Sequence, residues 1–290
     1  MASVVETIGL RPGLSARLWT FARRNPTIVL GGALLVAMAA IALIAPLIAG
    51  DPRLMTPANR LRTPSAGHWF GTDNLGRDVF ARSVYGARIS LLVGLSVSIV
   101  SVIAGLAIGL AAGYYRRMDG FVMRIMDGLM AIPAILLAIA LVSLNRASIW
   151  IVIVAIAIPE VPRVVRLVRS VVLTTREQPF IEAAIGGGSR NLKIILRHIL
   201  PSTIAPLVVQ ATYITASAIL IEAALSFLGA GVPPEIPTWG NMIASSRLFL
   251  ASAPWTIFFP GAALALVILA VNLMGDGLRD RLDPRLARRM

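Results

Sequence analysis

Cysteine is absent from this 290-residue chain, and histidine and charged residues are scarce. Without cysteine, the protein has no disulfide, no thiolate metal site and no cysteine nucleophile. The two histidines, His68 and His198, form no His-x-x-x-His pair, so no metal site is expected. Only 14% of the residues are charged and 57% are hydrophobic, whereas an ordinary soluble domain carries roughly 25% charged residues. This composition argues against a soluble protein and favours an integral membrane protein.

Six runs without charged residues are candidates for membrane spans. A spanning helix needs about 20 apolar residues, because the hydrocarbon core is about 30 Å thick. The fourth run is short and reaches this length only if Glu160 and Arg163 lie at the membrane interface. The first run is longer than the apolar region of a cleaved signal peptide, so we interpret it as an uncleaved span. The six runs are 25–50, 89–115, 128–145, 147–159, 198–221 and 248–275.

The net charge of +13 informs the topology of such a chain. If there are six spans, the side that holds both termini carries 18 Lys and Arg residues, against eight on the opposite side. Because cytoplasmic loops retain an excess of positive charge, both termini are expected to be cytoplasmic. The basic excess therefore indicates a membrane lipid environment and no nucleic-acid partner. The chain divides into an N-terminal segment (1–24), a first span with an outer loop (25–88), a five-span core (89–276) and a C-terminal tail (277–290).

Six arginines between residues 53 and 88 fall on the outer side, against this rule. In the stretch 74–85, Leu75, Val79 and Phe80 share one helical face, and Asp78 and Arg82 have the i, i+4 spacing of an ion pair. This pattern favours an amphipathic helix on the outer surface, before the second span. The alternative is a solvated loop with scattered charge.

The longest cytoplasmic segment, 163–200, is where a soluble partner could bind. Phe180, Ile181, Ala184 and Ile185 form one apolar face of a short helix. Three glycines follow at 186–188, and each destabilises a helix by about 1 kcal/mol relative to Ala, so the chain is expected to turn there. Ser189 is a candidate N-cap for a second helix. The segment therefore predicts a helix, a glycine turn and a second helix that project into the cytoplasm.

Motifs in this segment and elsewhere resemble those of ABC importer permeases. Glu182-Ala183-Ala184, then Gly188, then His198-Ile199-Leu200-Pro201 is similar to the cytoplasmic signature of that family. Gly186 and Gly187 stand where the family usually has Ala-Leu. Further stretches resemble the branch that transports dipeptides, oligopeptides and nickel; they are 70–78, 85–92, 222–229, 237–242, and Asp127 with Ile132-Pro133. The resemblance covers about residues 20–285.

The resemblance implies an all-α integral membrane protein of the type I importer kind. It implies six transmembrane helices, cytoplasmic termini, the outer amphipathic helix before the second span, and a coupling helix between spans four and five. The chain would be a permease subunit without catalytic residues or cofactors of its own, in a prokaryotic inner membrane. Its partners would be a second homologous permease, two ATP-binding subunits that hold ATP and Mg²⁺, and an extracytoplasmic solute-binding protein. Peptides or related small solutes would be transported.

The resemblance also assigns roles to individual residues. Glu182 would pair with a basic group on the ATPase, although a solvated helix face is the alternative. The outer loops would contact the binding protein, with Arg77, Asp78, Pro237 and Trp239 as candidates. The full set expected to contact the ATPase is Phe180, Ile181, Glu182, Ala183, Ala184, Gly188, Ser189 and Arg190.

Three acidic residues lie within or beside apolar runs, where a charge is unfavourable and suggests a function. Asp127 is expected to pair with Arg124 or Arg163 near the cytoplasmic face, and Glu160 with an arginine at the interface. Glu222 lies deeper; it makes a polar contact inside the bundle or with the partner permease, or it lines the pathway. The glycines at 105, 109 and 113 recur every four residues, which favours close helix packing over pore lining.

Other classes of protein fit the sequence less well. An ion-gradient-driven secondary transporter is the main alternative, but it would show inverted repeats with broken helices, and no convincing repeat is present. An ion channel subunit would need a selectivity-filter loop, which we do not find. An enzyme is least favoured, because the sequence has no Gly-x-x-x-x-Gly-Lys phosphate loop, metal cluster or nucleophile elbow.

Overall fold

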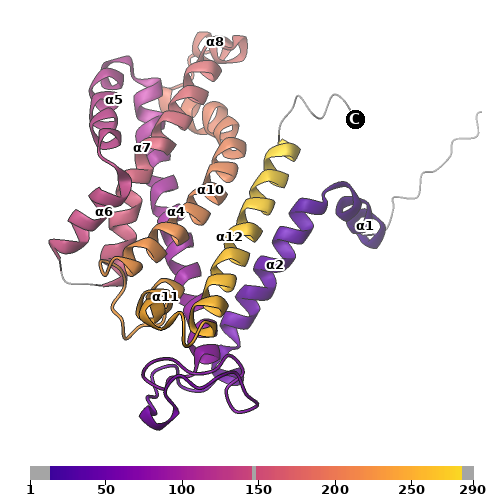
Figure 1. The fold of residues 1–290 in the computed structure, drawn as a ribbon. Coiled ribbons are helices and arrows are strands. Elements are labelled where there is room, and N and C mark those ends of the chain that lie inside the picture. Colours follow the sequence, from indigo (N-terminus) through magenta and orange to yellow (C-terminus); the bar gives the residue numbers. More distant parts are fainter. Residues whose placement is uncertain (1–13, 146–147, 283–290) are drawn as a thin grey trace, which may run out of the picture.

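The computed structural model describes residues 14–145 and 148–282, and within them the regular elements are all helices. Figure 1 shows the helices running mainly along one direction, with α8 at one end of the bundle and long loops at the other. The outer ends of the expected tails, 1–13 and 283–290, lie outside the described residues. The helices are α1 (Leu14–Arg24), α2 (Pro26–Leu43), α3 (Ala45–Ile48), α4 (Val79–Tyr114), α5 (Arg116–Ala131), α6 (Ala134–Ser143), α7 (Ile149–Arg176), α8 (Pro179–Gly186), α9 (Asn191–Ile194), α10 (Leu200–Phe227), α11 (Trp239–Ser246) and α12 (Trp255–Leu282), with a π-helical turn Ile195–Ile199 between α9 and α10 and short 3₁₀ turns at Pro57–Asn59 and Arg247–Phe249.

Four helical stretches are long and apolar enough to cross a membrane, and a bent pair makes a fifth. The four are α2, α4, the continuous stretch of α9 to α10, and α12. The pair is α5 and α6, which meet at an angle of 86°. The expected third span, 128–145, is therefore not one straight helix. Pro133 explains the bend, because a residue before proline is driven out of the helical region, and Ile132 has φ −91° and ψ 128°.

The expected fourth span, 147–159, is only the first part of α7. This helix continues through Pro159 and Pro162 to Arg176, so it extends well into the segment that we expected to be cytoplasmic loop. Close packing against α4 accounts for the continuation. A Cβ atom added to Gly105, Gly109 or Gly113 of α4 would lie 2.4–2.7 Å from the Cβ atoms of Val164, Val168 and Val172 of α7. The prediction that these glycines serve helix packing is confirmed.

The outer amphipathic helix expected at 74–85 is not present as a separate element. Residues 74–76 form a turn in which Gly76 has φ +74°, and α4 begins at Val79 and runs without a break for 36 residues. Asp78 is the N-cap of α4, because its side chain accepts a hydrogen bond of 2.8 Å from the amide of Ala81. The expected Asp78–Arg82 pair is also absent, since Asp78 lies 2.8 Å from Nδ1 of His68.

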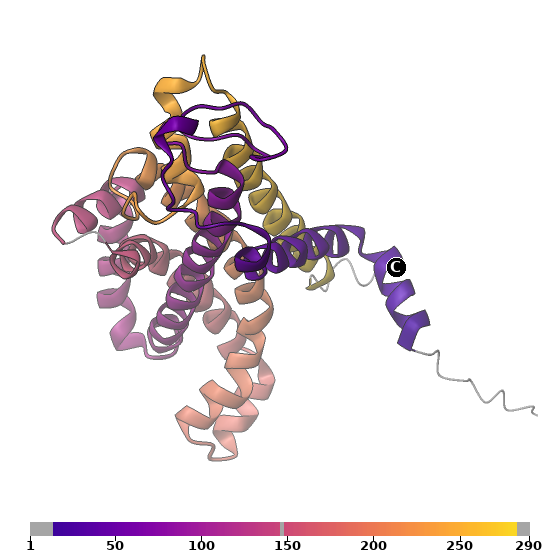
Figure 2. The same ribbon diagram turned by 90° about the horizontal axis from the view of Figure 1, so that it is seen from below.

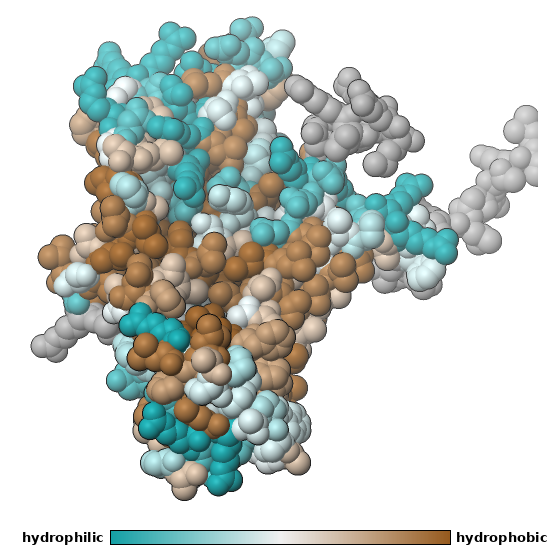
Figure 3. Space-filling view, viewed as in Figure 1, coloured by the Kyte–Doolittle hydropathy of each residue, from teal (hydrophilic) through white to brown (hydrophobic). Residues whose placement is uncertain are grey.

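The surface shows the division expected of a membrane protein. Figure 3 shows a brown hydrophobic band around the middle of the molecule and hydrophilic teal regions at both ends. Figure 2, turned by 90°, shows that the loops around 50–78 and 228–254 cluster at the end opposite α8. The two polar ends are therefore built from different parts of the chain.

At one side of the bundle, α2 packs against α12. A Cβ atom on Gly31 would lie 2.6 Å from the carbonyl oxygen of Ala270.

Candidate functional site

The segment from α8 to α9 forms a projection at one end of the molecule (Figure 1). Pro179 occupies the first turn of α8, where a missing amide proton has no consequence. Ile181 is fully buried and joins the main hydrophobic core, whereas Phe180 and Ile185 are about half exposed, at 50% and 55%. One apolar side chain thus anchors α8 while the rest of the helix remains accessible.

The glycine turn has the hydrogen bonds of a Schellman motif. The amide of Ser189 donates to the carbonyl of Ala184 at 3.0 Å, and the amide of Gly188 donates to that of Ile185 at 2.9 Å. Gly188 has φ +72°, a conformation that glycine adopts without steric cost. The expected helix, turn and second helix are confirmed. Ser189, however, is not the N-cap of α9. That position is occupied by Arg190, whose side chain makes no capping hydrogen bond.

Most of the expected ATPase-contact residues lie on the surface of this projection. Glu182, Ala183, Gly188 and Arg190 are exposed, and Ala184 and Ser189 are partly buried. Glu182 forms no ion pair with any of the described residues. Its carboxylate is therefore available to a group outside this chain. Ile181 differs from the others, since it is buried and supports α8 from below.

Hydrogen bonds connect the projection to the end of α4, and the end of α4 to the end of α7. The Tyr114 hydroxyl, at the last residue of α4, donates to Oδ1 of Asn191 at 3.0 Å, directly after the glycine turn. Arg176, at the end of α7, donates to the carbonyls of Gly113 and Tyr114 at 3.3 and 3.4 Å. The projection is thus bonded to α4 directly and to α7 through the end of α4.

Two ion pairs join α7 to α5. Arg169 donates to both carboxylate oxygens of Asp119, with 2.7 Å between Nη2 and Oδ2. Arg166 donates to Asp127 at 2.6 Å. We expected Asp127 to pair with Arg124 or Arg163. Its partner is indeed an arginine, but it is Arg166 and neither of the two that we expected. Sequence reasoning missed Asp119, and the only available signal was the spacing of Arg166 and Arg169, which places them on one face of a helix.

The two acids in the bundle have different surroundings. Glu160 is fully buried and accepts hydrogen bonds from Arg163 at 2.9 and 3.1 Å, which confirms the expected arginine partner. Glu222 is also fully buried and accepts a bond of 2.8 Å from Ser226, one turn later in α10. Its Oε2 has no hydrogen-bond partner in the described part of the chain. Glu222 thus makes a polar contact inside the bundle with one oxygen only.

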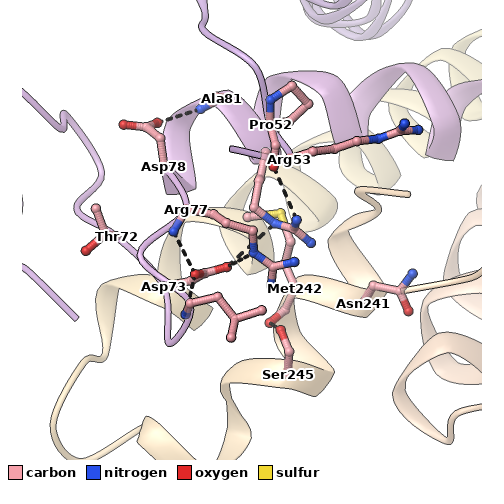
Figure 4. A network of polar contacts seen from close by, with 12 residues as sticks. Pro52, Arg53, Thr72, Asp73, Arg77, Asp78, Ala81, Asn241, Met242 and Ser245 are labelled. Atoms are coloured by element: carbon pink, nitrogen blue, oxygen red, sulfur yellow. Dashed lines mark hydrogen bonds and ion pairs between the residues drawn. The ribbon is translucent and has the colours of Figure 1, made fainter. Parts of the chain in front are cut away.

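Three of the four residues expected to contact a binding protein are buried. Arg77 is 6% exposed and donates from Nε to Asp73 at 2.7 Å (Figure 4). Trp239 is fully buried and donates from Nε1 to the carbonyl of Ser83 at 3.0 Å. Pro237 is buried and Asp78 is partly buried. The burial of Arg77, Pro237 and Trp239 argues against direct contact through these three side chains, whereas contact through Asp78 stays a prediction.

Comparison with known proteins supports the same class of protein. The chain is 62% identical over 268 residues to a probable peptide ABC transporter permease protein of Sinorhizobium fredii, covering 92% of each chain. It is 48% identical to a dipeptide transport system permease protein of Alkalihalophilus pseudofirmus, covering 91% of this chain and 88% of the other. Among solved structures, the MetNI methionine ABC transporter in inward facing conformations has a similar fold, with a TM-score of 0.57, 18% identity, and coverage of 69% of this chain and 95% of that chain.

A family model supplies the assignment. The model described as binding-protein-dependent transport system inner membrane component matches residues 78–288, which is most of the chain. Such components are transport subunits and not enzymes, and they work with ATPase and binding-protein components. The match accounts for the long apolar helices of a multi-pass protein in the cytoplasmic membrane. The chain therefore belongs to the family of binding-protein-dependent transport system inner membrane components, the permease subunits of ABC transporters.

Proposed function

We propose that this chain forms half of the translocation pathway of an ATP-driven importer of peptides or related small solutes. The observation that carries the proposal is the projection of α8 and α9, which is anchored by the buried side chains of Ile181 and Ile194 and is joined by a hydrogen bond to α4, which is itself bonded to α7. The names of the relatives in Sinorhizobium fredii and Alkalihalophilus pseudofirmus support peptides as the transported class.

The assembly that we propose contains four further chains. A second permease, identical or related, completes the pathway, and two ATP-binding subunits supply the chemistry. ATP and Mg²⁺ bind to those subunits and not to this chain. An extracytoplasmic solute-binding protein delivers the solute to the loops at the end opposite α8.

In the membrane, we propose six spans with both termini in the cytoplasm. The first part of α7 is the fourth span, and the bent pair of α5 and α6 is the third. The distribution of 18 against eight basic residues supports this orientation. The described ends of α1 and α12 lie toward the same end of the molecule as α8 (Figure 1), as this topology requires.

Coupling follows from the contacts of the projection. The exposed side of α8 inserts into a groove on an ATPase subunit, with Glu182 facing a basic group. When the two ATPases close on ATP, α8 moves with them. Tyr114 and Arg176 pass this movement to α4 and α7, and Asp119 passes it to α5, so the bundle alternates between inward-open and outward-open states.

The proposal is tested by purification and reconstitution. We expect the tagged chain, extracted in mild detergent, to copurify with a second permease and with ATPase subunits. In vesicles that contain the loaded binding protein, peptide uptake should require ATP and should persist when ionophores collapse all ion gradients. Uptake that needs a gradient and no ATP would instead support a secondary transporter and reject the proposal.

A further inference from the structure

The six arginines on the outer side do not share one explanation. Arg77 and Arg82 surround the buried carboxylate of Asp73, at 2.7 and 3.8 Å; Figure 4 shows Asp73 and Arg77 joined in this network. The guanidinium of Arg60 lies over the ring of Phe249, 5.5 Å from its centre. These three arginines therefore stabilise the outer loops.

Arg53 and Arg88 have no such partner. Both are exposed, and neither forms an ion pair with the residues of 14–145 and 148–282. Both line the same cavity, which has a volume of about 670 Å³ and lies at the end of the molecule opposite α8. This volume is within the range of pockets that hold small ligands, about 300–1,000 Å³.

The lining of this cavity suits a carboxylate. Arg53 comes from the loop after α3, whereas Tyr85 and Arg88 come from successive turns of one face of α4. Guanidinium groups bind carboxylates through paired, charge-assisted hydrogen bonds, and a tyrosine hydroxyl can add a further donor. The lining contains one acid, Asp51, whose Oδ1 accepts a hydrogen bond of 2.8 Å from the amide of Arg53. The lining thus carries two positive charges and one negative charge, and the carboxylate of Asp51 already accepts a hydrogen bond from the backbone of the loop.

The position of Arg88 favours a small solute as the occupant. It lies ten residues into α4, about 15 Å along the helix axis from residue 78 at 1.5 Å per residue. Pro237 and Ile236, from the loop before α11, close another side of the cavity. A carboxylate on a small, extended molecule can reach this position between the loops.

We propose that this cavity is an entry site that binds the terminal carboxylate of the transported peptide through Arg88 and Arg53. The inference rests on the proposed function, because it takes the transported class to be peptides. It assigns a role to the two arginines that line the cavity, which the topology rule leaves unexplained. The site holds the peptide at the outer mouth after the binding protein releases it.

Chemical protection of the arginines tests this site without any mutation. The intact complex, in cells with an exposed outer membrane face, is treated with a membrane-impermeant, arginine-selective dicarbonyl, and modification is measured residue by residue by mass spectrometry. The probes are trialanine and its C-terminal amide. We expect trialanine at twice its dissociation constant to slow modification of Arg88 and Arg53 about threefold, whereas the amide does not protect. Arg62, an exposed outer arginine that does not line the cavity, is the control and should react equally in all samples.

Three outcomes would overturn the proposal. Equal protection by trialanine and its amide would show that the carboxylate is not recognised. Protection by the binding protein without peptide would assign the cavity to docking of that protein. An unreactive Arg88 in the complex without peptide would show that a partner chain covers the cavity. None of these outcomes affects the proposed function, which fails only if peptide uptake does not depend on ATP.

A substitution provides an independent measurement. R88Q should lower ATP-driven peptide uptake at saturating binding protein at least about tenfold, the effect of losing roughly 1.4 kcal/mol of charge-assisted hydrogen bonding. Copurification with the ATPase should be unchanged. R62Q is the matched control and should transport normally. Equal uptake by R88Q and the unmodified chain would contradict the entry site.

Discussion

Arg169 of α7 donates hydrogen bonds to both carboxylate oxygens of Asp119 of α5, across 50 positions of sequence. The two side chains are only 30% and 26% exposed, so solvent screens the pair less than it screens a fully exposed pair. The paired geometry fixes the orientation of α5 relative to α7 as well as the distance between them. The pair therefore ties α7 to the first helix of the bent pair of α5 and α6.

A double-mutant cycle measures this connection. D119A and R169A should each lower the melting temperature of the purified complex, and the double variant should be less destabilised than the sum of the two. We expect a coupling energy of about 1 kcal/mol, the upper range for partly exposed pairs. Peptide transported per ATP hydrolysed should also fall in both single variants. Strictly additive effects on stability would show that the pair contributes nothing.

The glycine face of α4 leads to a second prediction. G105A places a Cβ atom 2.4 Å from that of Val164, a distance that real structures do not show, so α4 and α7 must separate. Overpacking of this kind destabilises by about 1–3 kcal/mol. G120A is the matched control, because nothing lies within 4 Å of the added Cβ and alanine is favoured in the helix α5. Thermal melting should separate the two variants, and equal stability would contradict the packing role.

The coupling segment leads to a third prediction. E182R and G188D should abolish transport while the protein remains in the membrane, since one reverses an exposed charge and the other puts a side chain where φ is +72°. Copurification of the ATPase should be lost in E182R. E177R makes the same charge change on an exposed residue just before α8 and should transport normally. Transport by E182R would disprove the coupling assignment.

Local sequence patterns predicted the features that depend on neighbouring residues. The apolar runs located α2, α4, α10 and α12, and the glycines at 186–188 predicted the turn after α8. The outer helix at 74–85 was wrong because the pattern does not show where a helix begins. Asp78 is an N-cap, so only the residues from Val79 onward are helical.

Pairings between distant parts of the chain could not be read from the sequence. Asp119 and Arg169 come together because α4 and α7 pack closely along their glycines and valines. The burial of Trp239 depends likewise on α11 packing beside Ser83, 156 positions away. The helix and turn of α8 could be predicted locally, but the burial of Ile181 beside the exposed Phe180 and Ile185 could not, because it depends on packing against the core.

Glu222 leads to the last prediction, which separates a hydrogen-bonding role from a charge role. Its Oε1 accepts a hydrogen bond from Ser226, and its Oε2 has no partner within the described residues. A glutamine can accept the same bond with its carbonyl oxygen, so E222Q should retain transport and stability. E222A removes the acceptor and leaves a cavity in a fully buried position, so it should lower the melting temperature. S226A should also lower the melting temperature, because it leaves both oxygens of the buried Glu222 carboxylate without a hydrogen bond while keeping its volume. If E222Q abolishes transport while its melting temperature is unchanged, then the negative charge itself is required, and Glu222 acts on the transported solute or a proton and does not merely hold α10 in place.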